Sequence, residues 1–569
     1  MTGNALTIQS SKGESRVKSV LRSLSVLGGF SGATAILIAI PVLALIYTAL
    51  FSPIDETFSD LADTVLWDYC LNSISVVFFT LIFACLFAVA PAWWCARYQF
   101  KGRRYLQWAM VFPLAIPAYI SAYIYTDALD YAGPIQTGLR SLMGWTSPND
   151  YWFFDIRSLG GASLMLALAL YPYIFLLMRN AFAKQSESLE QAARLMGANT
   201  FEIFFKVHLP MVRPALAIGC TLVAMEALAD FGTVHLFAIS TLTTAIYDSW
   251  LVYGSLGTAT KISCLLLLFV VSLVWLERHQ RSQQKQFELK GGAPLQAKPA
   301  TVKQQLLIWS VCLTIIALGF VIPVLTLIGY TLDYLAENWH HTLFTHAQNT
   351  FLLAAAAAVL CTLIALLLNA NLRFKPSTAA KTKMGIASLG YAIPGTVLAI
   401  AVLIPLGFMD IQVNEWLEAL GMDTVGLIFS GSTIALLLAF VIRFSAIANG
   451  SVNSAYGQIN PNLDLAARTL NSRNGRIFHK IHIPLITPAA ISALLLVFIE
   501  CVKELPAAIL LRPFDFETLS TYVYQFASDE QLEHGALAAL LIIVVSLLPI
   551  ALLAYTSARN TQRSPHAEH

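Results

Sequence analysis

Charged side chains are scarce in this chain of 569 residues: Asp, Glu, Lys and Arg together make up only 12% of it. Soluble proteins carry about 25%. Hydrophobic residues make up 57% of the chain, and the mean hydropathy is +0.67. This balance excludes an ordinary soluble domain. It predicts an all-α, polytopic membrane protein, since an apolar stretch of about 20 residues spans a bilayer as one helix.

Several motifs of enzymes and metal sites are missing as well. The chain has no G-x-x-x-x-G-K-[ST] sequence, and no Gly-Lys dipeptide at all, so it has no Walker A loop to bind ATP. It has no G-x-S-x-G motif, no His, Asp and Glu cluster with metal-ligand spacing, and no C-x-x-C pair among its eight cysteines. We therefore expect no catalytic residue, no cofactor and no stable metal site, and a membrane enzyme finds little support.

Apolar runs predict twelve membrane spans, six in each half of the chain. About 23 polar and basic residues precede the first run, which is long enough to span, so we expect a signal anchor rather than a cleavable signal peptide. The spans are expected at residues 24–50, 72–96, 106–129, 158–180, 214–234, 259–277, 306–330, 348–370, 384–409, 428–448, 486–507 and 535–556.

The spans predict five segments along the chain. These are a cytosolic N-terminal tail (1–23), a first transmembrane repeat (24–280), a cytosolic linker (281–305), a second transmembrane repeat (306–557) and a cytosolic C-terminal tail (558–569).

Basic residues predict the orientation, because short cytosolic loops are rich in Lys and Arg. We assign 30 of the 35 Lys and Arg residues to one side, and Arg443 is among these 30. This assignment places both termini in the cytosol. The outer segments are acidic or neutral, either because positive charge is depleted there or because a carrier protein docks on them. The five exceptions are Arg140, Arg157, Lys261, Arg512 and Lys503, the last within a span.

Residues 189–214 recur 274 positions later as residues 463–488, in two expected cytosolic loops. Apolar residues at i, i+3, i+4 and i+7 predict a short amphipathic helix at the start of each copy. Both halves enter the membrane with the same orientation, so the repeat is parallel and its axis runs along the membrane normal. The apolar stripes are Leu189, Ala192, Ala193 and Met196 in the first copy, and Leu463, Ala466, Ala467 and Leu470 in the second.

The repeated loop resembles the cytoplasmic signature loop of ABC-importer permeases, which reads Glu-Ala-Ala, three residues, Gly, nine residues and Ile-x-Leu-Pro. Both copies keep this spacing but lack the family's Glu, with an acid one place earlier instead. The first copy reads Gln191-Ala192-Ala193, Gly197 and Val207-His208-Leu209-Pro210; the second reads Leu465-Ala466-Ala467, Asn471 and Ile481-His482-Ile483-Pro484.

The resemblance implies that each loop lies in a groove of an ATPase subunit and couples it to transport. Small side chains at Ala193 and Ala467 suit close contact. The change from Gly197 to Asn471 predicts that the first loop is the more sensitive. The expected coupling residues are Glu190, Ala192, Ala193, Gly197 and Pro210 in the first loop and Asp464, Ala466, Ala467, Asn471 and Pro484 in the second.

Four further segments look like those of the fused, two-repeat permeases of the ferric-iron ABC import family: Leu228–Val234, Thr243–Tyr247, Glu504–Ala508 and Leu511–Phe514. The resemblance implies a type I ABC importer permease in the lipid of the bacterial inner membrane. Its implied partners are two copies of a separate ATPase subunit and a periplasmic binding protein that delivers Fe3+, with no nucleic acid. Thiamine, polyamine and phosphonate permeases share some of these segments and stay open as alternatives.

An ion-gradient-driven secondary transporter is the alternative from another class, because twelve spans alone would permit it. A gradient-driven carrier has no reason to keep a duplicated cytosolic helix, so the repeated loops favour the ATP-driven importer.

Charged residues inside two predicted spans mark a second candidate site. Glu226 and Asp230 lie in the fifth span, and Glu500 and Glu504 hold the matching places in the eleventh, beside Lys503. A charge at the bilayer centre costs about 2.5–3.5 kcal/mol, so these groups should face a protein interior or an aqueous path. They form either a cation path, since hard cations prefer oxygen ligands, or a structural set in which Lys503 neutralises Glu500 or Glu504.

His208 and His482 each stand two places before a proline in the repeated loops. Histidine is a common metal ligand, but an interfacial position at the membrane entry is the simpler expectation for both.

Overall fold

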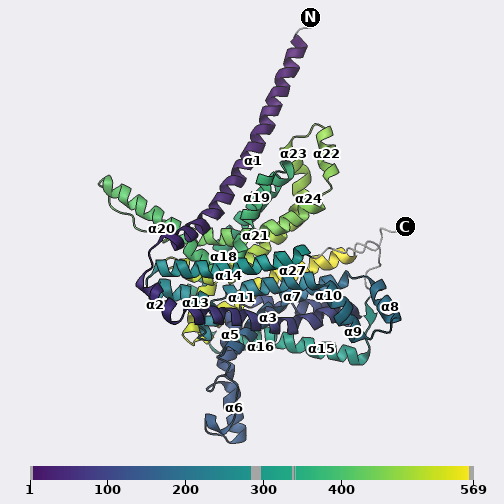
Figure 1. The fold of residues 1–569 in the computed structure, drawn as a ribbon, viewed down its shortest axis with the longest axis vertical. Helices are drawn as coiled ribbons and strands as arrows, with labels where there is room; N and C mark the ends of the chain where they lie inside the picture. The colour runs from purple at the N-terminus through teal and green to yellow at the C-terminus, as the bar shows by residue number, and fades with distance from the viewer. Residues whose placement is uncertain (1–3, 284–296, 336–338, 340, 563–569) are drawn as a thin grey trace. The chain divides into compact units, whose positions relative to one another are not determined.

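The computed structural model describes residues 4–283, 297–335, 339 and 341–562, and most of them are helical (Figure 1). The strands within these ranges are two residues long: β1 (Tyr98–Gln99) pairs in parallel with β2 (Lys298–Pro299). The all-α prediction is therefore confirmed. Parts of the predicted tails and linker, residues 1–3, 284–296 and 563–569, lie outside the described residues.

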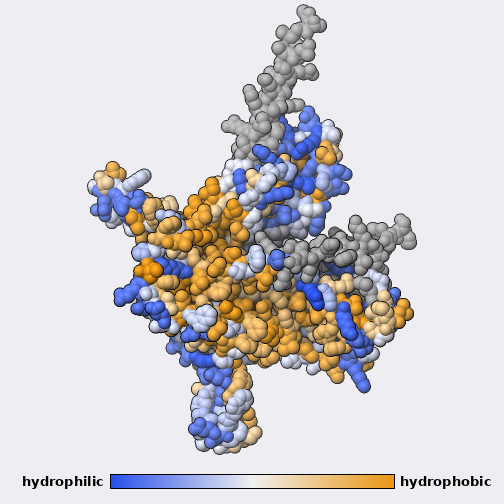
Figure 2. Space-filling view, in the orientation of Figure 1, coloured by the Kyte–Doolittle hydropathy of each residue, from blue (hydrophilic) through white to orange (hydrophobic). Residues whose placement is uncertain are grey.

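Nine helices among the described residues are long and apolar enough to cross a membrane. Two helix pairs are long and apolar enough only when taken together, and they are bent by 87° between Ala115 and Ala118 and by 70° between Met211 and Arg213. A shorter apolar helix covers Leu532–Leu548. Each of the twelve predicted spans therefore coincides with an apolar helix or a bent pair. In the space-filling view, hydrophobic residues cover broad areas of the surface, and hydrophilic residues gather over α6 (Pro134–Met143) (Figure 2).

The chain packs as two compact units. The first-loop unit joins Ser52–Ala347 to Glu517–His569 and holds the first copy of the repeated loop. Besides α6, β1 and β2, its elements are α2 (Glu56–Thr64), α3 (Leu66–Arg97), α4 (Arg103–Ala109), η1 (Phe112–Ala115), α5 (Ala118–Leu129), η2 (Pro148–Asp150), α7 (Leu159–Ala183), α8 (Glu187–Leu195), α9 (Thr200–Ile203), η3 (Phe204–His208), α10 (Leu209–Met211), α11 (Arg213–Ala229), α12 (Gly232–Leu236), α13 (Leu242–Tyr247), η4 (Asp248–Val252), α14 (Leu256–Gln283), α15 (Val302–Ile316), η5 (Ala317–Val321), α16 (Ile322–Asp333), α26 (Leu519–Ser528) and α27 (Leu532–Gln562).

The second-loop unit joins Met1–Phe51 to Gln348–Phe516 and holds the second copy. Its elements are α1 (Asn4–Phe51), most of α18 (His341–Phe374), α19 (Thr378–Ala387), η6 (Gly390–Ala392), α20 (Gly395–Ala419), α21 (Thr433–Gln458), α22 (Pro461–Thr469), α23 (Asn474–Ile477), η7 (Phe478–His482), α24 (Ile483–Lys503) and α25 (Pro506–Leu511).

The first helix of each half packs with helices of the other half. α1 lies against α19 and α20, and α15 lies against α3. The predicted repeats, 24–280 and 306–557, therefore describe how the sequence is duplicated, and the packing crosses their boundary.

Small residues allow close packing in both units. In the first-loop unit, Ala84, Ala88 and Ala92 recur every fourth residue along α3 and are fully buried, where α3 packs on α7. In the second-loop unit, α18 buries Ala358 and Cys361, and the Cys361 thiol donates to the Val441 carbonyl of α21 at 3.6 Å. Small side chains let helix backbones approach closely in a bilayer, where packing replaces the hydrophobic effect as the driving force.

Candidate functional site

The repeated loop folds in the same way in both units. Each copy begins with a nine-residue helix, α8 or α22, and continues through a four-residue helix, α9 or α23. A five-residue π-helical turn follows, η3 or η7, and ends at His208 or His482. The repeat in sequence is therefore also a repeat in structure.

A tight turn ends the first helix of each loop. Gly197 and Asn471 occupy the same place in this turn, with left-handed backbone angles φ of +84° and +58°. The N–H of the next residue donates to the carbonyl five residues earlier, at 3.1 Å in the first loop and 3.0 Å in the second. Because glycine and asparagine tolerate this conformation best, Asn471 replaces Gly197 without a change of fold. This substitution therefore gives no reason to expect that the two loops differ in sensitivity.

The Glu190 carboxylate is fully buried in the first loop. Arg97, at the end of α3, donates to its Oε1, and Arg194 and Lys298 reach the same oxygen at 2.9 and 3.0 Å. His208 lies 3.8 Å from the other oxygen. The loop is thus joined to a spanning helix and, through Lys298 in β2, to the end of the linker.

Asp464 holds the matching place in the second loop. Arg373, near the end of α18, donates to its Oδ2 at 2.7 Å and to the Ile459 carbonyl at 3.2 Å. His482 Nε2 lies 2.8 Å from Oδ1. Each loop therefore has a carboxylate, an arginine from the spanning helix that ends beside it, and a histidine.

Both loop carboxylates are ionised at neutral pH. Burial by itself raises the pKa of Glu190, but the hydrogen bond from Lys298 and the charge of Arg97 outweigh it and lower the pKa below its usual value. Burial of Asp464 is likewise outweighed by His482 and Arg373, so its pKa is also lowered. These acids bind cations of their own unit.

The predicted coupling residues fall into an outer and an inner set. Ala192 and Ala466 are exposed, whereas Ala193 and Ala467 are only 3% and 7% exposed. The expectation that these last two alanines touch an ATPase is therefore corrected, since they face their own unit. Pro210 in α10 and Pro484 in α24 each follow the π-helical turn of their loop, within one continuous helical run.

Large apolar side chains cover the outer face of each loop. Leu195, Met196 and Phe201 are 90%, 81% and 72% exposed in the first loop, and Leu465 and Leu470 are 59% and 81% exposed in the second. We call these two sets the outer patches. Exposed apolar patches mark interaction surfaces. The predicted apolar stripes contain Met196 and Leu470 but not the other three, which lie beside them. The side chain of Leu189 lies outside the described residues.

The two loop histidines are buried within their own units, and their expected position at the membrane interface stays a prediction. His208 is 1% exposed, with its Nδ1 2.5 Å from the side-chain oxygen of Gln185 and its ring 4.4 Å from that of Trp93. His482 is fully buried, and its ring stacks on Phe374 at 5.1 Å. Both rings therefore fix the π-helical turn against the ends of spanning helices.

Asp230 and Glu504 each stand where a spanning helix breaks, between α11 and α12 and between α24 and α25. Asp230 accepts the backbone N–H groups of Thr233 at 2.9 Å and Val234 at 3.1 Å, and also the Thr233 hydroxyl at 3.1 Å. Glu504 accepts the N–H of Ala507 at 3.2 Å. The first N–H groups of a helix have no acceptor within it, so both acids satisfy the start of the following helix.

Arg443 supplies a cation for Glu504. It lies in the middle of α21, is 5% exposed, and places its Nε 3.4 Å from a Glu504 oxygen. The prediction that Arg443 lies on the cytosolic side is therefore wrong. The sequence could have indicated this, because the predicted span 428–448 contains Arg443. Lys503 pairs with Glu500 at 3.2 Å, one of its two expected partners. A side chain at Gly395 would collide with both Glu504 and Arg443.

The four acids are distributed over both units. Glu226 and Asp230 belong to the first-loop unit, and Glu500 and Glu504 belong to the second-loop unit. Glu226 is half-buried in α11, four residues before Asp230. A common cation path through all four acids stays a prediction.

The chain matches the protein family described as binding-protein-dependent transport system inner membrane component twice, at residues 88–285 and 362–567. Each match contains one copy of the repeated loop and the helix break that follows it.

Individual relatives match either the whole chain or part of it. The Fe(3+)-transport system permease protein FbpB 2 of Haemophilus influenzae is 24% identical over 82% of this chain and 86% of its own length. The ferric transport system permease protein FbpB of Actinobacillus pleuropneumoniae is 24% identical over 84% of this chain and 70% of its own. The molybdenum transport system permease protein ModB of Escherichia coli is 27% identical over 38% of this chain and 96% of its own.

Replacing Glu190 by Gln should loosen the first loop, because it leaves Arg97 buried without its anion. Breaking a buried ion pair costs about 3–5 kcal/mol. Amide hydrogen exchange in residues 187–203 should therefore become about a hundredfold faster or more. Since the pKa of Glu190 is lowered in the folded loop, the wild-type protection should hold at neutral pH and be lost only as the pH falls through that lowered pKa.

Glu202→Gln is the matched control, because Glu202 pairs with Lys206 on the exposed face of the same loop at 3.0 Å. Such a pair contributes about 0.3–0.5 kcal/mol. Equal exchange rates in the two variants would show that the buried pair does not hold the loop.

Replacing Glu504 by Gln should lower the yield of folded protein, because Arg443 loses this carboxylate. The double change Arg443→Gln and Glu504→Gln should restore most of the yield, since neither charge remains. Asp230→Asn should change the yield little, because the amide oxygen still accepts backbone N–H groups. Size-exclusion chromatography after graded heating measures each yield, and a double variant as unstable as Glu504→Gln alone would refute the pairing.

Proposed function

Because the chain belongs to the family of binding-protein-dependent transport system inner membrane components, we propose that it is the permease subunit of an ATP-driven importer for ferric iron. The two family matches account for the duplicated loops and for the multi-pass helical fold. Iron is proposed as the substrate because of the share of this chain that each relative matches. Relatives named as ferric permeases match 82% and 84% of the chain, across both halves, whereas the molybdenum permease matches 38%.

In this proposal a separate ATPase supplies the energy, since the chain has no Walker A loop. One ATPase subunit docks on each outer patch, so the importer contains two. Leu195, Met196 and Phe201 would fill an apolar groove of the first subunit, as helix-in-groove contacts do, and Leu465 with Leu470 would do the same for the second. Ala192 and Ala466 lie on the same exposed side.

The two loop carboxylates would let the docked loops transmit motion to the spanning helices. Glu190 joins the first loop to α3, and Asp464 joins the second to α18. A displacement of either patch by the closing ATPase therefore moves a spanning helix rather than a loose segment. This supports alternating access by rigid-body motion.

The proposed orientation places both termini and both loops in the cytosol of a bacterium, with the chain in its inner membrane. The Lys and Arg distribution supports it. A periplasmic binding protein would then deliver iron at the opposite face.

Asp230 and Glu504 are proposed to border the cation path. Broken helices are the elements from which transporters build binding sites near the bilayer midplane, and these two acids stand at the breaks. Carboxylate oxygens suit a hard cation such as Fe3+. Arg443 would keep the charge near Glu504 from trapping the ion, because binding in a path must be weak enough for release.

The proposal is tested by uptake into proteoliposomes that contain the chain, its ATPase and its binding protein. Iron should accumulate when ATP is supplied, and molybdate, thiamine and spermidine should not. Met196→Glu and Leu470→Glu should each lower iron uptake at least tenfold at unchanged insertion, because a charge in an apolar groove disfavours docking.

Val302→Glu is the matched control, since Val302 is 84% exposed at the start of α15 and lies outside both patches. Uptake of molybdate in place of iron would overturn the substrate. Unchanged uptake in both patch variants would overturn the docking surfaces.

A further inference from the structure

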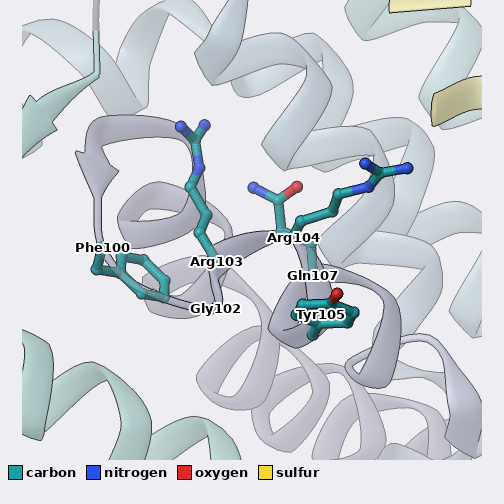
Figure 3. Close-up of a pocket in the computed structure, with 6 residues that line it drawn as sticks. All are labelled: Phe100, Gly102, Arg103, Arg104, Tyr105 and Gln107. Atoms are coloured by element: carbon teal, nitrogen blue, oxygen red, sulfur yellow. The ribbon is translucent and has the colours of Figure 1, made fainter. Parts of the chain in front are cut away.

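Arginines surround an open depression at the end of α3. The depression has a volume of about 430 Å³ and lies in the turn that leads from β1 into α4. Figure 3 shows the Arg103 and Arg104 side chains on either side of the Gln107 amide, with the Tyr105 ring beside them. Phe100 and Gly102 complete the lining.

A second segment brings another arginine close to this depression. Arg179, near the end of α7, lies close enough to Arg103 for the two positive charges to interact. Arg103 donates its Nε to the Cys95 carbonyl at 2.8 Å, and Arg179 donates to the Asn180 side chain at 3.1 Å. Within the described ranges of the chain, no carboxylate forms an ion pair with Arg103, Arg104 or Arg179. Neighbouring guanidinium groups without an acid favour an anionic ligand.

The walls of the depression are held in place. Gly102 has a φ of +78°, and a Cβ there would lie 2.7 Å from the ring of Trp309. The Trp309 indole donates to the Lys101 carbonyl at 3.3 Å, and Gln107 donates to the Cys95 carbonyl at 3.0 Å. An anion would therefore meet a formed surface and would not have to order the turn first.

We propose that this depression binds the headgroup of an anionic phospholipid from the cytosolic leaflet. In the orientation proposed above, on which this assignment rests, the depression lies at the cytosolic end of α3, where basic residues and aromatic rings mark the lipid interface. Tyr105 is 79% exposed there, beside the exposed Arg104. Basic pockets at the cytosolic ends of spanning helices recognise anionic headgroups in this way. The lipid would stabilise the end of α3, from which Arg97 holds the first loop.

Native mass spectrometry of the purified chain tests this assignment, with phosphatidylglycerol, phosphatidylcholine and inorganic phosphate as separate probes. Phosphatidylglycerol should bind at least fivefold more tightly than phosphatidylcholine. Arg104→Gln should weaken phosphatidylglycerol binding about fivefold, and Arg104→Gln with Arg179→Gln about twentyfold, as expected for removed charges near a lipid surface.

Arg476→Gln is the control, because Arg476 is an exposed arginine of the second loop, and it should leave the binding unchanged. Equal binding of the two lipids, or equal weakening in the control, would overturn the proposal. Displacement of the lipid by millimolar phosphate would assign the site to a free anion instead. If only the ATPase subunit protects Arg104 from phenylglyoxal, the surface is a protein contact and the lipid site is wrong.

Discussion

One interaction holds each repeated loop to the rest of its unit: the ion pair between a loop carboxylate and an arginine at the end of a spanning helix. Arg97 holds Glu190, and Arg373 holds Asp464. Because the first pair is almost fully withdrawn from solvent, it is screened less than a surface pair and is costly to break. The short helices α8 and α22 are marginal on their own, so this attachment is what holds them in place, as the proposed docking requires.

A second constraint acts inside the membrane, where every backbone N–H needs an acceptor. The two halves supply these acceptors in different ways at their corresponding helix breaks. Asp230 accepts hydrogen bonds from the first turn of α12, whereas Glu504 accepts the N–H of Ala507 in α25 and also pairs with Arg443. The duplication has thus kept an acid at the break in each half, while the surroundings of the two acids differ.

Much of this architecture could be predicted from the sequence, because spans and loops leave local signals. Apolar runs located the helices, and the exact spacing of the repeat located both loops. The direction in which a loop residue points leaves no such signal. Ala193 and Ala467 looked suited to a partner, yet they pack inward, and exposed Leu195 and Phe201 were missed. The pairing of Arg443 with Glu504 joins residues 61 positions apart in different helices, and the packing of α1 on α20 depends on contacts that no local pattern encodes.

The central proposal is that the loop carboxylates transmit motion from the ATPase to the spanning helices. The number of iron ions imported per ATP hydrolysed tests it most directly. Arg373→Gln and Asp464→Asn should both lower this ratio while ATP hydrolysis continues. Lys375→Gln, an exposed change two residues from Arg373, should leave it unchanged. A wild-type ratio in both Arg373→Gln and Asp464→Asn, with the second loop shown to be loosened by hydrogen exchange, would contradict the account.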